Sequence, residues 1–266
     1  MPGATASTET LRPPLKWAGG KRWQVPLLRS IWTPHAHRRL VEPFCGGLGV
    51  AFGLMPERAT LNDANVHLIN FYRWIQKGLR PSIEMANDEA LFYRHRDRFN
   101  ALVREGGSHT REAAELFYFM NRTAYNGLCR FNSRGEFNAP FGQYKRINYA
   151  LDFLGYREAL SGWEFHAGDF AGIPLDPADF VYADPPYDVE FTSYSQGGFS
   201  WDDQERTAEH FATHKGPVVL VNQSTPRIEA LYQRLGYALR PLDGPRRISC
   251  DGDRTPAKEI LATRNL

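Results

Sequence analysis

Seven short apolar runs recur along the chain, and each ends at a turn residue or a charged residue. They are RRLVEPF (38–44), ATLNDA (59–64), WEFHAGD (163–169), DFVYADPP (179–186), PVVLVNQS (217–224), YALRPL (237–242) and EILATR (259–264). Stretches long enough to form helices separate the first five runs, which is typical of parallel strands joined by crossover helices. The last two runs flank the turn-rich stretch DGPRRISCDGD and predict an antiparallel pair at the sheet edge. The pattern therefore predicts an α/β fold.

The interval between the second and third predicted strands is too long for a single crossover. Within it, EAAELFYFMNR (112–122) has the periodicity of an amphipathic helix. The following segment, NGLCRFNSRGEFNAPFGQYKR (126–146), is rich in glycine, asparagine and aromatic residues, with basic residues between them. We therefore predict that residues 72–150 form an inserted, mostly helical domain, and that residues 1–71 and 151–266 form the domain that holds the sheet.

Composition adds a local charge asymmetry to this picture. The chain has 266 residues, of which 42% are hydrophobic, enough for one large domain with an insertion. Its net charge is only +2, but residues 10–41 contain seven basic residues and no acidic one, and residues 121–150 contain five basic residues and one acidic residue. Local positive charge is expected on a surface that faces phosphates, although ordinary solvated faces give similar counts.

Several classes of protein are excluded by what the sequence lacks. The cysteines Cys45, Cys129 and Cys250 are scattered, without CxxC or Cys/His spacing, so no metal site is expected. Such a sparse count suits a reducing cytoplasm. The first dozen residues lack an apolar core and no apolar run reaches 18 residues, so neither a signal peptide nor a membrane span is predicted. We expect a cytoplasmic protein.

The glycine-rich stretch VEPFCGGLGVAFGL (41–54) predicts a tight turn after the first strand, with close approach of the backbone to a ligand. A dinucleotide fingerprint needs glycine where Phe52 stands, and a P-loop fails at Leu15 and Arg22. What remains is a Rossmann-like first turn without a pyrophosphate requirement, or a plain strand-to-helix turn. At the end of the second strand, Asp63 is expected to accept from ribose hydroxyls or to cap the next helix, and both roles could apply together.

The stretch Asp-Pro-Pro-Tyr ends the fourth predicted strand, at the sheet edge where ligands bind in such folds. Asp184 offers a carboxylate oxygen, Pro185 a carbonyl, and Tyr187 a flat apolar surface. Together they predict a clamp for a planar ring that carries an exocyclic amine. Accepting both amine hydrogens favours a pyramidal nitrogen with its lone pair free to attack. S-adenosylmethionine, a sulfonium methyl donor held by Asp63 and the glycine turn, fits as the electrophile. The alternative is a rigid turn capped by Asp184.

The chain resembles DNA adenine-N6 methyltransferases of the Dam/DpnM group over nearly its whole length. The matching pieces, in family order, are LKWAGGKR (15–22), EPFCGGLG (42–49), NDAN (62–65), NRTAYNGLCRFNSRGEFNAPFGQYK (121–145), ADPPY (183–187) and FTSYSQGGFS (191–200). The resemblance implies a Rossmann-like, seven-stranded S-adenosylmethionine-dependent methyltransferase sheet. It also implies a catalytic domain from residues 1–71 and 151–266, with a helical target-recognition insertion at 72–150.

The resemblance assigns roles to several residues near the sheet edge. It implies catalytic roles for Asp184, Pro185 and Tyr187. The residues implied to contact the cofactor are Trp17, Lys21, Phe44, Asp63, Asp169 and Asp184. Among these, Trp17 and Lys21 would border its methionine end, Asp63 would bind the ribose, and Asp169 would lie near the adenine.

A second set of implied residues would bind double-stranded DNA. They are Lys16, Tyr125, Asn126, Leu128, Arg130, Tyr144 and Lys145. Lys16 and Arg130 would each read a guanine, and Leu128 would contact a thymine methyl group. Tyr125 and Asn126 would lie near an adenine extruded from the duplex. The implied target is 5′-GATC-3′, although relatives also recognise sites that only begin with GAT. For Arg130, a phosphate contact alone is the alternative.

Two other functions stay open at this point. The Asp-Pro-Pro-Tyr stretch also suits an exocyclic-amine methyltransferase that acts on RNA or on cytosine N4. The basic segments also suit a catalytically silent regulator that only binds DNA. We expect a monomer that takes S-adenosylmethionine as its cofactor.

Overall fold

The computed structural model describes residues 11–188, 198–244 and 257–266. The strands are β1 (Leu40–Glu42), β2 (Ala59–Asp63), β3 (Trp163–Ala167), β4 (Phe180–Ala183), β5 (Val218–Gln223), β6 (Ala238–Gly244) and β7 (Ala257–Arg264). The helices are α1 (Val25–Trp32), α2 (Ala51–Leu54), α3 (Val66–Gln76), α4 (Glu89–Arg104), α5 (Arg111–Thr123), α6 (Leu154–Ala159), α7 (Trp201–Ala212) and α8 (Pro226–Arg234). All seven predicted strands and the predicted helix at 112–122 are confirmed.

The strands form one sheet in the order β3-β2-β1-β4-β5-β7-β6. β1 to β5 are mutually parallel, and β7 runs antiparallel to both β5 and β6. The predicted antiparallel pair at the edge is thus confirmed, with β6 outermost. Most of the turn-rich stretch between β6 and β7, and residues 191–197 of the stretch 191–200, lie outside the described residues.

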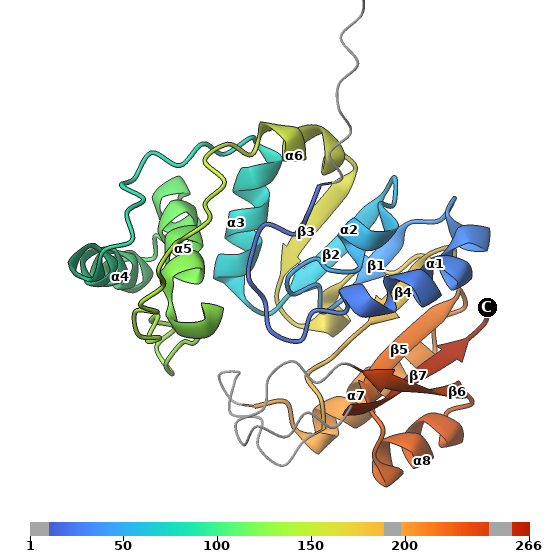
Figure 1. The fold of residues 1–266 in the computed structure, drawn as a ribbon. Coiled ribbons are helices and arrows are strands. Elements are labelled where there is room, and N and C mark those ends of the chain that lie inside the picture. The colour runs from blue at the N-terminus through green and yellow to red at the C-terminus, as the bar shows by residue number, and fades with distance from the viewer. Residues whose placement is uncertain (1–10, 189–197, 245–256) are drawn as a thin grey trace, which may run out of the picture.

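Both faces of the sheet are buried, and alternate residues of each central strand point to opposite faces. Val41 and Val181 lie in a core shared with Phe211 of α7 and Leu231 of α8. Their chain neighbours Leu40 and Phe180 lie instead in the core of the other face, to which α1, α2 and α3 contribute. The result is a three-layer arrangement with α7 and α8 on one side of the sheet (Figure 1).

The helices between β2 and β3 extend the molecule beyond α3 (Figure 1). α5 packs on α3, and α4 packs on α5. After α5 the chain folds back on itself through isolated bridges that join Ala124 to Phe141 and Phe131 to Phe137. The division into a catalytic domain and an insertion at 72–150 stays a prediction, since α3 continues across residue 72. Within the described ranges, no helix combines the length and apolarity needed to cross a membrane.

Candidate active site

The parallel strands bring the predicted polar residues to one edge of the sheet, because β1, β2 and β4 all end there. An ion pair stands at its centre: Lys21 Nζ lies 3.0 Å from Asp184 Oδ2. The same ammonium donates to the Gly19 carbonyl at 2.8 Å and lies 4.5 Å from the centre of the Tyr187 ring. Pro185 is buried directly beside them. Three of the predicted residues, from opposite ends of the chain, are therefore in contact.

One oxygen of this carboxylate is left without a partner. Asp184 Oδ1 is buried and has no partner at hydrogen-bonding geometry among the described residues, and the neighbouring buried hydroxyl of Tyr187 has none either. A buried acceptor in this state costs about 1–3 kcal/mol unless a ligand satisfies it. The site therefore has an unmet demand for a hydrogen-bond donor at the position where an amine was predicted.

Two further carboxyl groups surround the ion pair, and sequence reasoning missed both. Burial raises the pKa of Asp184, and the Lys21 ammonium opposes that rise. Burial, and then the negative charge of Asp184, raise the pKa of Glu42 on β1 well above its usual range. Burial also raises the pKa of Glu259 on β7, again opposed by Lys21. With one ammonium among three carboxyl groups, the protonated form of Glu42 is favoured. The available signal for Glu42 was an acid directly after the apolar pair Leu40-Val41 of a predicted strand.

The Asp-Pro-Pro-Tyr turn is held from behind by side chains that the sequence analysis did not single out. Gln204 of α7 donates its amide to the Pro186 carbonyl at 2.7 Å. Asn222 of β5 is fully buried, donates to Gln204 Oε1 at 2.8 Å and accepts from the Asp188 amide at 3.3 Å. These bonds fix the second half of the turn, at Pro186 and Asp188. An asparagine within the apolar run at 217–224 was the only signal.

Asp63 lies at the end of β2 and faces the glycine turn. Its Oδ2 accepts from the Gly46 amide at 3.0 Å, and its Oδ1 accepts from the Asn65 amide at 2.9 Å. The N-cap of α3 is Asn65, whose side chain accepts from the amides of His67 and Leu68. The alternative that Asp63 caps this helix is therefore wrong. Each oxygen keeps acceptor capacity for a ligand hydroxyl.

Trp17 packs directly on the glycine turn after β1. A Cβ atom at Gly46 would lie 2.8 Å from Trp17 Nε1, and one at Gly47 would lie 2.5 Å from Trp17 Cβ. Both distances are shorter than van der Waals contact. The glycines are thus needed to let the indole reach the turn.

Gly47→Ala is expected to destabilise the protein by about 1–3 kcal/mol, because the added methyl group displaces Trp17 from well-packed surroundings. Urea unfolding would measure the change. Gly172→Ala is the matched control, since a Cβ at Gly172 meets nothing within 4 Å. Equal stability of the two variants would contradict the close packing of Trp17.

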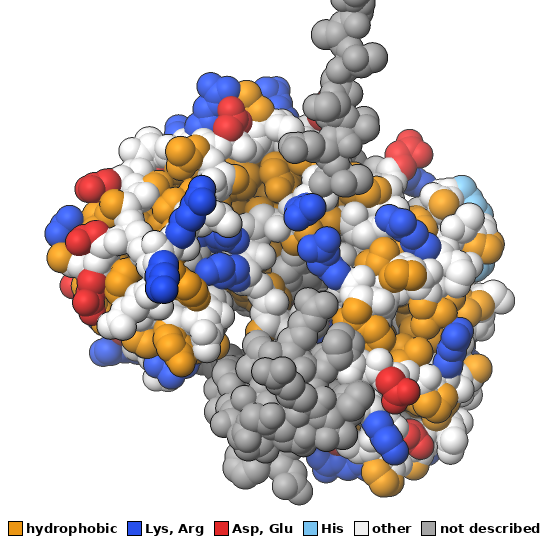
Figure 2. Space-filling view, viewed as in Figure 1, with side chains coloured by type: hydrophobic (Ala, Val, Ile, Leu, Met, Phe, Trp, Pro, Cys, Tyr) orange, Lys and Arg blue, Asp and Glu red, His pale blue; other side chains and the backbone are white. Residues whose placement is uncertain are grey.

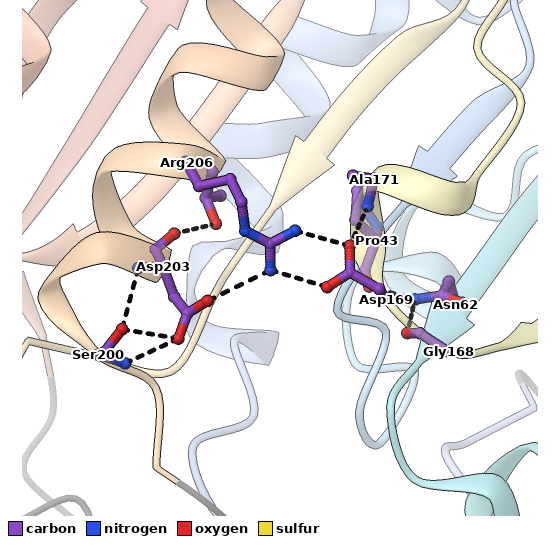
Figure 3. Close-up of polar contacts among 9 residues, drawn as sticks. Pro43, Asn62, Gly168, Asp169, Ala171, Ser200, Asp203 and Arg206 are labelled. Atoms are coloured by element: carbon purple, nitrogen blue, oxygen red, sulfur yellow. Dashed lines mark hydrogen bonds and ion pairs between the residues drawn. The ribbon is translucent and has the colours of Figure 1, made fainter.

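The ends of the first three strands are tied together near this turn. Asn62 Nδ2 donates to the carbonyls of Pro43 and Gly168, each at 3.0 Å (Figure 3). Phe44, on the turn itself, packs against the rings of Phe170 and Phe199. The predicted cofactor residue Phe44 is thus partly buried beside the strand ends.

Asp169, also a predicted cofactor residue, lies in an ion pair with α7. Arg206 donates to its two oxygens at 2.8 and 2.7 Å and also to Asp203 at 3.2 Å (Figure 3). Asp203 in turn forms a capping box with Ser200 at the start of α7. The Arg206 guanidinium holds the pKa of Asp169 below its usual range. No local pattern in the sequence predicts this pairing across 37 residues.

The predicted DNA-binding residues lie on and around the segment that follows α5. Lys16 Nζ lies 3.9 Å from the centre of the Tyr144 ring. Tyr125 is 52% exposed, and Asn126 next to it is exposed with a left-handed backbone (φ +50°). The exposed Arg130 donates to the side chain and the carbonyl of Asn138 at 2.8 and 3.0 Å.

Leu128 is half-buried in this segment and Lys145 is exposed. Figure 2 shows lysine and arginine side chains gathered over the middle of this face, between the α4–α5 side and the sheet. Most acidic side chains visible in this view lie towards its edges.

The strand order and directions define the class of protein. β7 lies between β5 and β6 and runs antiparallel to both, as in a Rossmann-like methyltransferase fold. Residues 17–242 match the family described as D12 class N6 adenine-specific DNA methyltransferase. The chain belongs to this family and is a DNA adenine N6 methyltransferase. The predicted family, fold and enzyme class are confirmed.

Curated relatives agree with this assignment. The chain is 35% identical over 270 residues to the DNA N-6-adenine-methyltransferase of Escherichia phage P1, covering 92% of this chain and 34% of that protein. The chain thus spans about a third of the length of the phage relative. It is 35% identical over 247 residues to the type II methyltransferase M1.LlaDCHI of Lactococcus lactis subsp. cremoris, covering 84% and 85% of the two chains. It is 33% identical over 270 residues to the DNA adenine methylase of Escherichia coli K12, covering 93% of each.

Proposed function

We propose that this protein transfers a methyl group from S-adenosylmethionine to N6 of an adenine flipped out of double-stranded DNA, at 5′-GATC-3′ sites. The observation that carries the proposal is the buried, unpartnered Asp184 Oδ1, which lies next to Pro185 and Tyr187. No group in the described part of the chain donates a hydrogen bond to the Pro185 carbonyl either. Two acceptors beside an aromatic ring suit an adenine amine.

The roles of the chain in the reaction follow from this arrangement. Asp184 Oδ1 and the Pro185 carbonyl would each accept one amine hydrogen, which keeps the nitrogen lone pair out of the ring. Tyr187 would hold the base plane, a contact worth about 1–3 kcal/mol in comparable complexes. When the nitrogen gains the methyl group, it loses one proton. We assign Asp184 as the group that first accepts this proton.

The residues beside this clamp fit S-adenosylmethionine, which when bound supplies an electrophilic methyl carbon. Asp63 retains acceptor capacity for two ribose hydroxyls, and the glycine turn lets a ligand approach the backbone closely. Trp17 and Lys21 would border its methionine end. Phe44 and Asp169 would border its adenine. The ion pair of Asp169 with Arg206 would then orient the Asp169 carboxylate.

The target amine is paired inside the duplex, so the adenine must leave the stack before it reaches Asp184. The exposed Tyr125 and Asn126 would occupy the space that the base vacates. Lys16, Tyr144, Lys145 and Arg130 would contact the DNA, and the phosphate contacts would weaken as salt increases. We propose that a monomer carries out the reaction.

The proposed function is tested by treating genomic DNA with the purified protein and S-adenosylmethionine and then sequencing the modified bases. N6-methyladenine within GATC is expected. Methylation of RNA or of cytosine N4 instead would support the second class of amine methyltransferase. Specific DNA binding without any transfer would identify a silent regulator.

Arg130→Ala is expected to relax discrimination at one base pair of the site by about 1–3 kcal/mol, because a paired guanine contact is lost. Methylation rates on duplexes altered at each position would measure this. Arg134→Ala is the matched control: Arg134 lies in the same segment, is 76% exposed and pairs with Glu136. A uniform loss of rate on every duplex would reassign Arg130 to a phosphate contact.

A further inference from the structure

Six residues connect the segment proposed to read DNA with the ion pair at the sheet edge. We call residues 16–21 the strap. At one end, Lys16 Nζ donates to the Arg122 carbonyl at 3.3 Å and lies over Tyr144. At the other end, Lys21 pairs with Asp184. Gly19 and Gly20 between them carry no side chains that could fix the path of the backbone.

One buried side chain holds the first residue of the strap. Asn121 of α5 is fully buried, accepts from the Lys16 amide at 3.0 Å and donates to the Lys16 carbonyl at 2.7 Å. Both backbone polar groups of Lys16 are thereby bound by a residue 105 positions away. Gly127 packs closely here as well, because a Cβ at that position would lie 2.8 Å from Lys16 Cβ.

We propose that Asn121 is a positioning residue, which couples the target-recognition segment to the methyl-donor site by fixing the start of the strap. The inference rests on the proposed function for the roles of Trp17, Lys21 and Asp184. With Asn121 in place, the start of the strap is held, and Lys21 meets Asp184 at 3.0 Å. Without it, the backbone of Lys16 loses both hydrogen bonds, and the start of the strap is held only through the Lys16 side chain, which contacts Arg122 and Tyr144. Asn121, at the start of the target-recognition segment, thus affects the position of Lys21 in the active site without contacting the substrate.

The chain offers a close structural control for this test. Asn100 of α4 binds the backbone of Phe137 in the same two-sided way, accepting from its amide at 2.7 Å and donating to its carbonyl at 3.1 Å. Phe137 does not lead to Lys21. Asn100→Ala therefore removes a similar pair of bonds within the same part of the fold, from a side chain that is partly buried. Asn121 is fully buried and in addition donates to Cys129 Sγ at 3.3 Å.

The test compares Asn121→Asp, Asn121→Ala and Asn100→Ala in the full-length protein, with three measurements on each. They are thermal unfolding, calorimetric affinity for S-adenosylmethionine without DNA, and the single-turnover rate on a GATC duplex as a function of pH. Asn121→Asp keeps the acceptor for the Lys16 amide and replaces only the donor to the Lys16 carbonyl, so it tests that second bond separately, whereas Asn121→Ala removes both.

Both Asn121 variants are expected to lose about 10- to 100-fold in single-turnover rate, since small misplacements of catalytic groups have effects of this size. Donor affinity without DNA is expected to fall as well. The acid limb of the pH–rate profile is expected to move to higher pH, because the weakened contact with Lys21 leaves Asp184 among titratable groups that carry no positive charge, namely Glu42, Glu259, Tyr182, Tyr187 and Tyr232. Asn100→Ala is expected to lower thermal stability and to leave donor affinity without DNA and the position of the acid limb unchanged.

The inference is overturned if Asn121 variants that fold lose stability as Asn100→Ala does but keep wild-type donor affinity, rate and pH profile. If Asn121→Ala does not fold, Asn121→Asp alone decides. A wild-type protein that neither binds the donor nor methylates DNA would instead contradict the proposed function, so the two failures are distinguishable.

Discussion

Asp184→Ala is expected to lower the rate of methyl transfer by about 10²- to 10⁴-fold, the range typical for loss of a group that acts directly on the reacting atom. The variant removes the unpartnered Oδ1 proposed to hold the amine, and it leaves the basic residues of the recognition segment intact. DNA affinity is therefore expected to stay at the wild-type value. Single-turnover methylation and equilibrium binding to a GATC duplex measure the two effects separately.

Asp179→Ala is the matched control for this prediction. Asp179 precedes β4 as Asp184 follows it, is buried, and pairs through both oxygens with Arg39. Each substitution therefore removes an aspartate from an ion pair at one end of the same strand. Asp179→Ala is expected to lower stability while the rate of the folded protein stays unchanged. Similar rates for the two variants would remove Asp184 from the chemistry.

Lys21→Met is expected to move the acid limb of the pH–rate profile to higher pH. The Lys21 ammonium opposes the rise that burial causes in the pKa of Asp184, so its removal raises this pKa further. A protonated Asp184 has lost an acceptor and cannot bind the amine as proposed. The rate is thus expected to fall most at the acid end and to recover partly as the pH rises.

Stability should respond to pH in the opposite sense in the same variant. Because the pKa of Asp184 is raised in the folded state, burying its charged form costs free energy, and the unfolding free energy falls as the pH rises through that pKa. Removing one partner of a buried ion pair typically costs about 3–5 kcal/mol. Urea unfolding at two pH values is expected to show a larger loss at the higher pH.

Lys77→Met provides the control for Lys21→Met. The Lys77 ammonium lies 4.7 Å from the centre of the Trp74 ring, much as Lys21 lies over Tyr187, but it is exposed and distant in the chain from the site. Its removal is expected to leave both pH profiles unchanged. An unshifted acid limb in Lys21→Met would show that Asp184 does not titrate under the influence of this ammonium.

Local sequence determined the secondary structure and part of the site. The β-strands could be predicted because each is a run of alternating or consecutive apolar residues that ends at Gly, Pro or an acidic residue. β4, for example, ends at Ala183 and is followed by Asp184-Pro185. The same local chemistry placed Asp63 and Asp184 at strand ends. Parallel strands then bring such ends to one edge of the sheet, so the neighbourhood of these two residues followed from periodicity and topology together.

Only the tertiary structure decided which side chains meet across large separations. Lys21 pairs with Asp184, Asn121 holds Lys16, and Arg206 pairs with Asp169, yet no local pattern in the sequence relates the members of these pairs. The same holds for the buried carboxyl groups of Glu42 and Glu259, which lie near the Lys21–Asp184 ion pair although no local pattern relates them to it. A hydrogen bond or ion pair depends on distance in space, and the packing of helices on the sheet sets that distance. Periodicity reports which face of an element is buried, but it does not report which residue lies opposite.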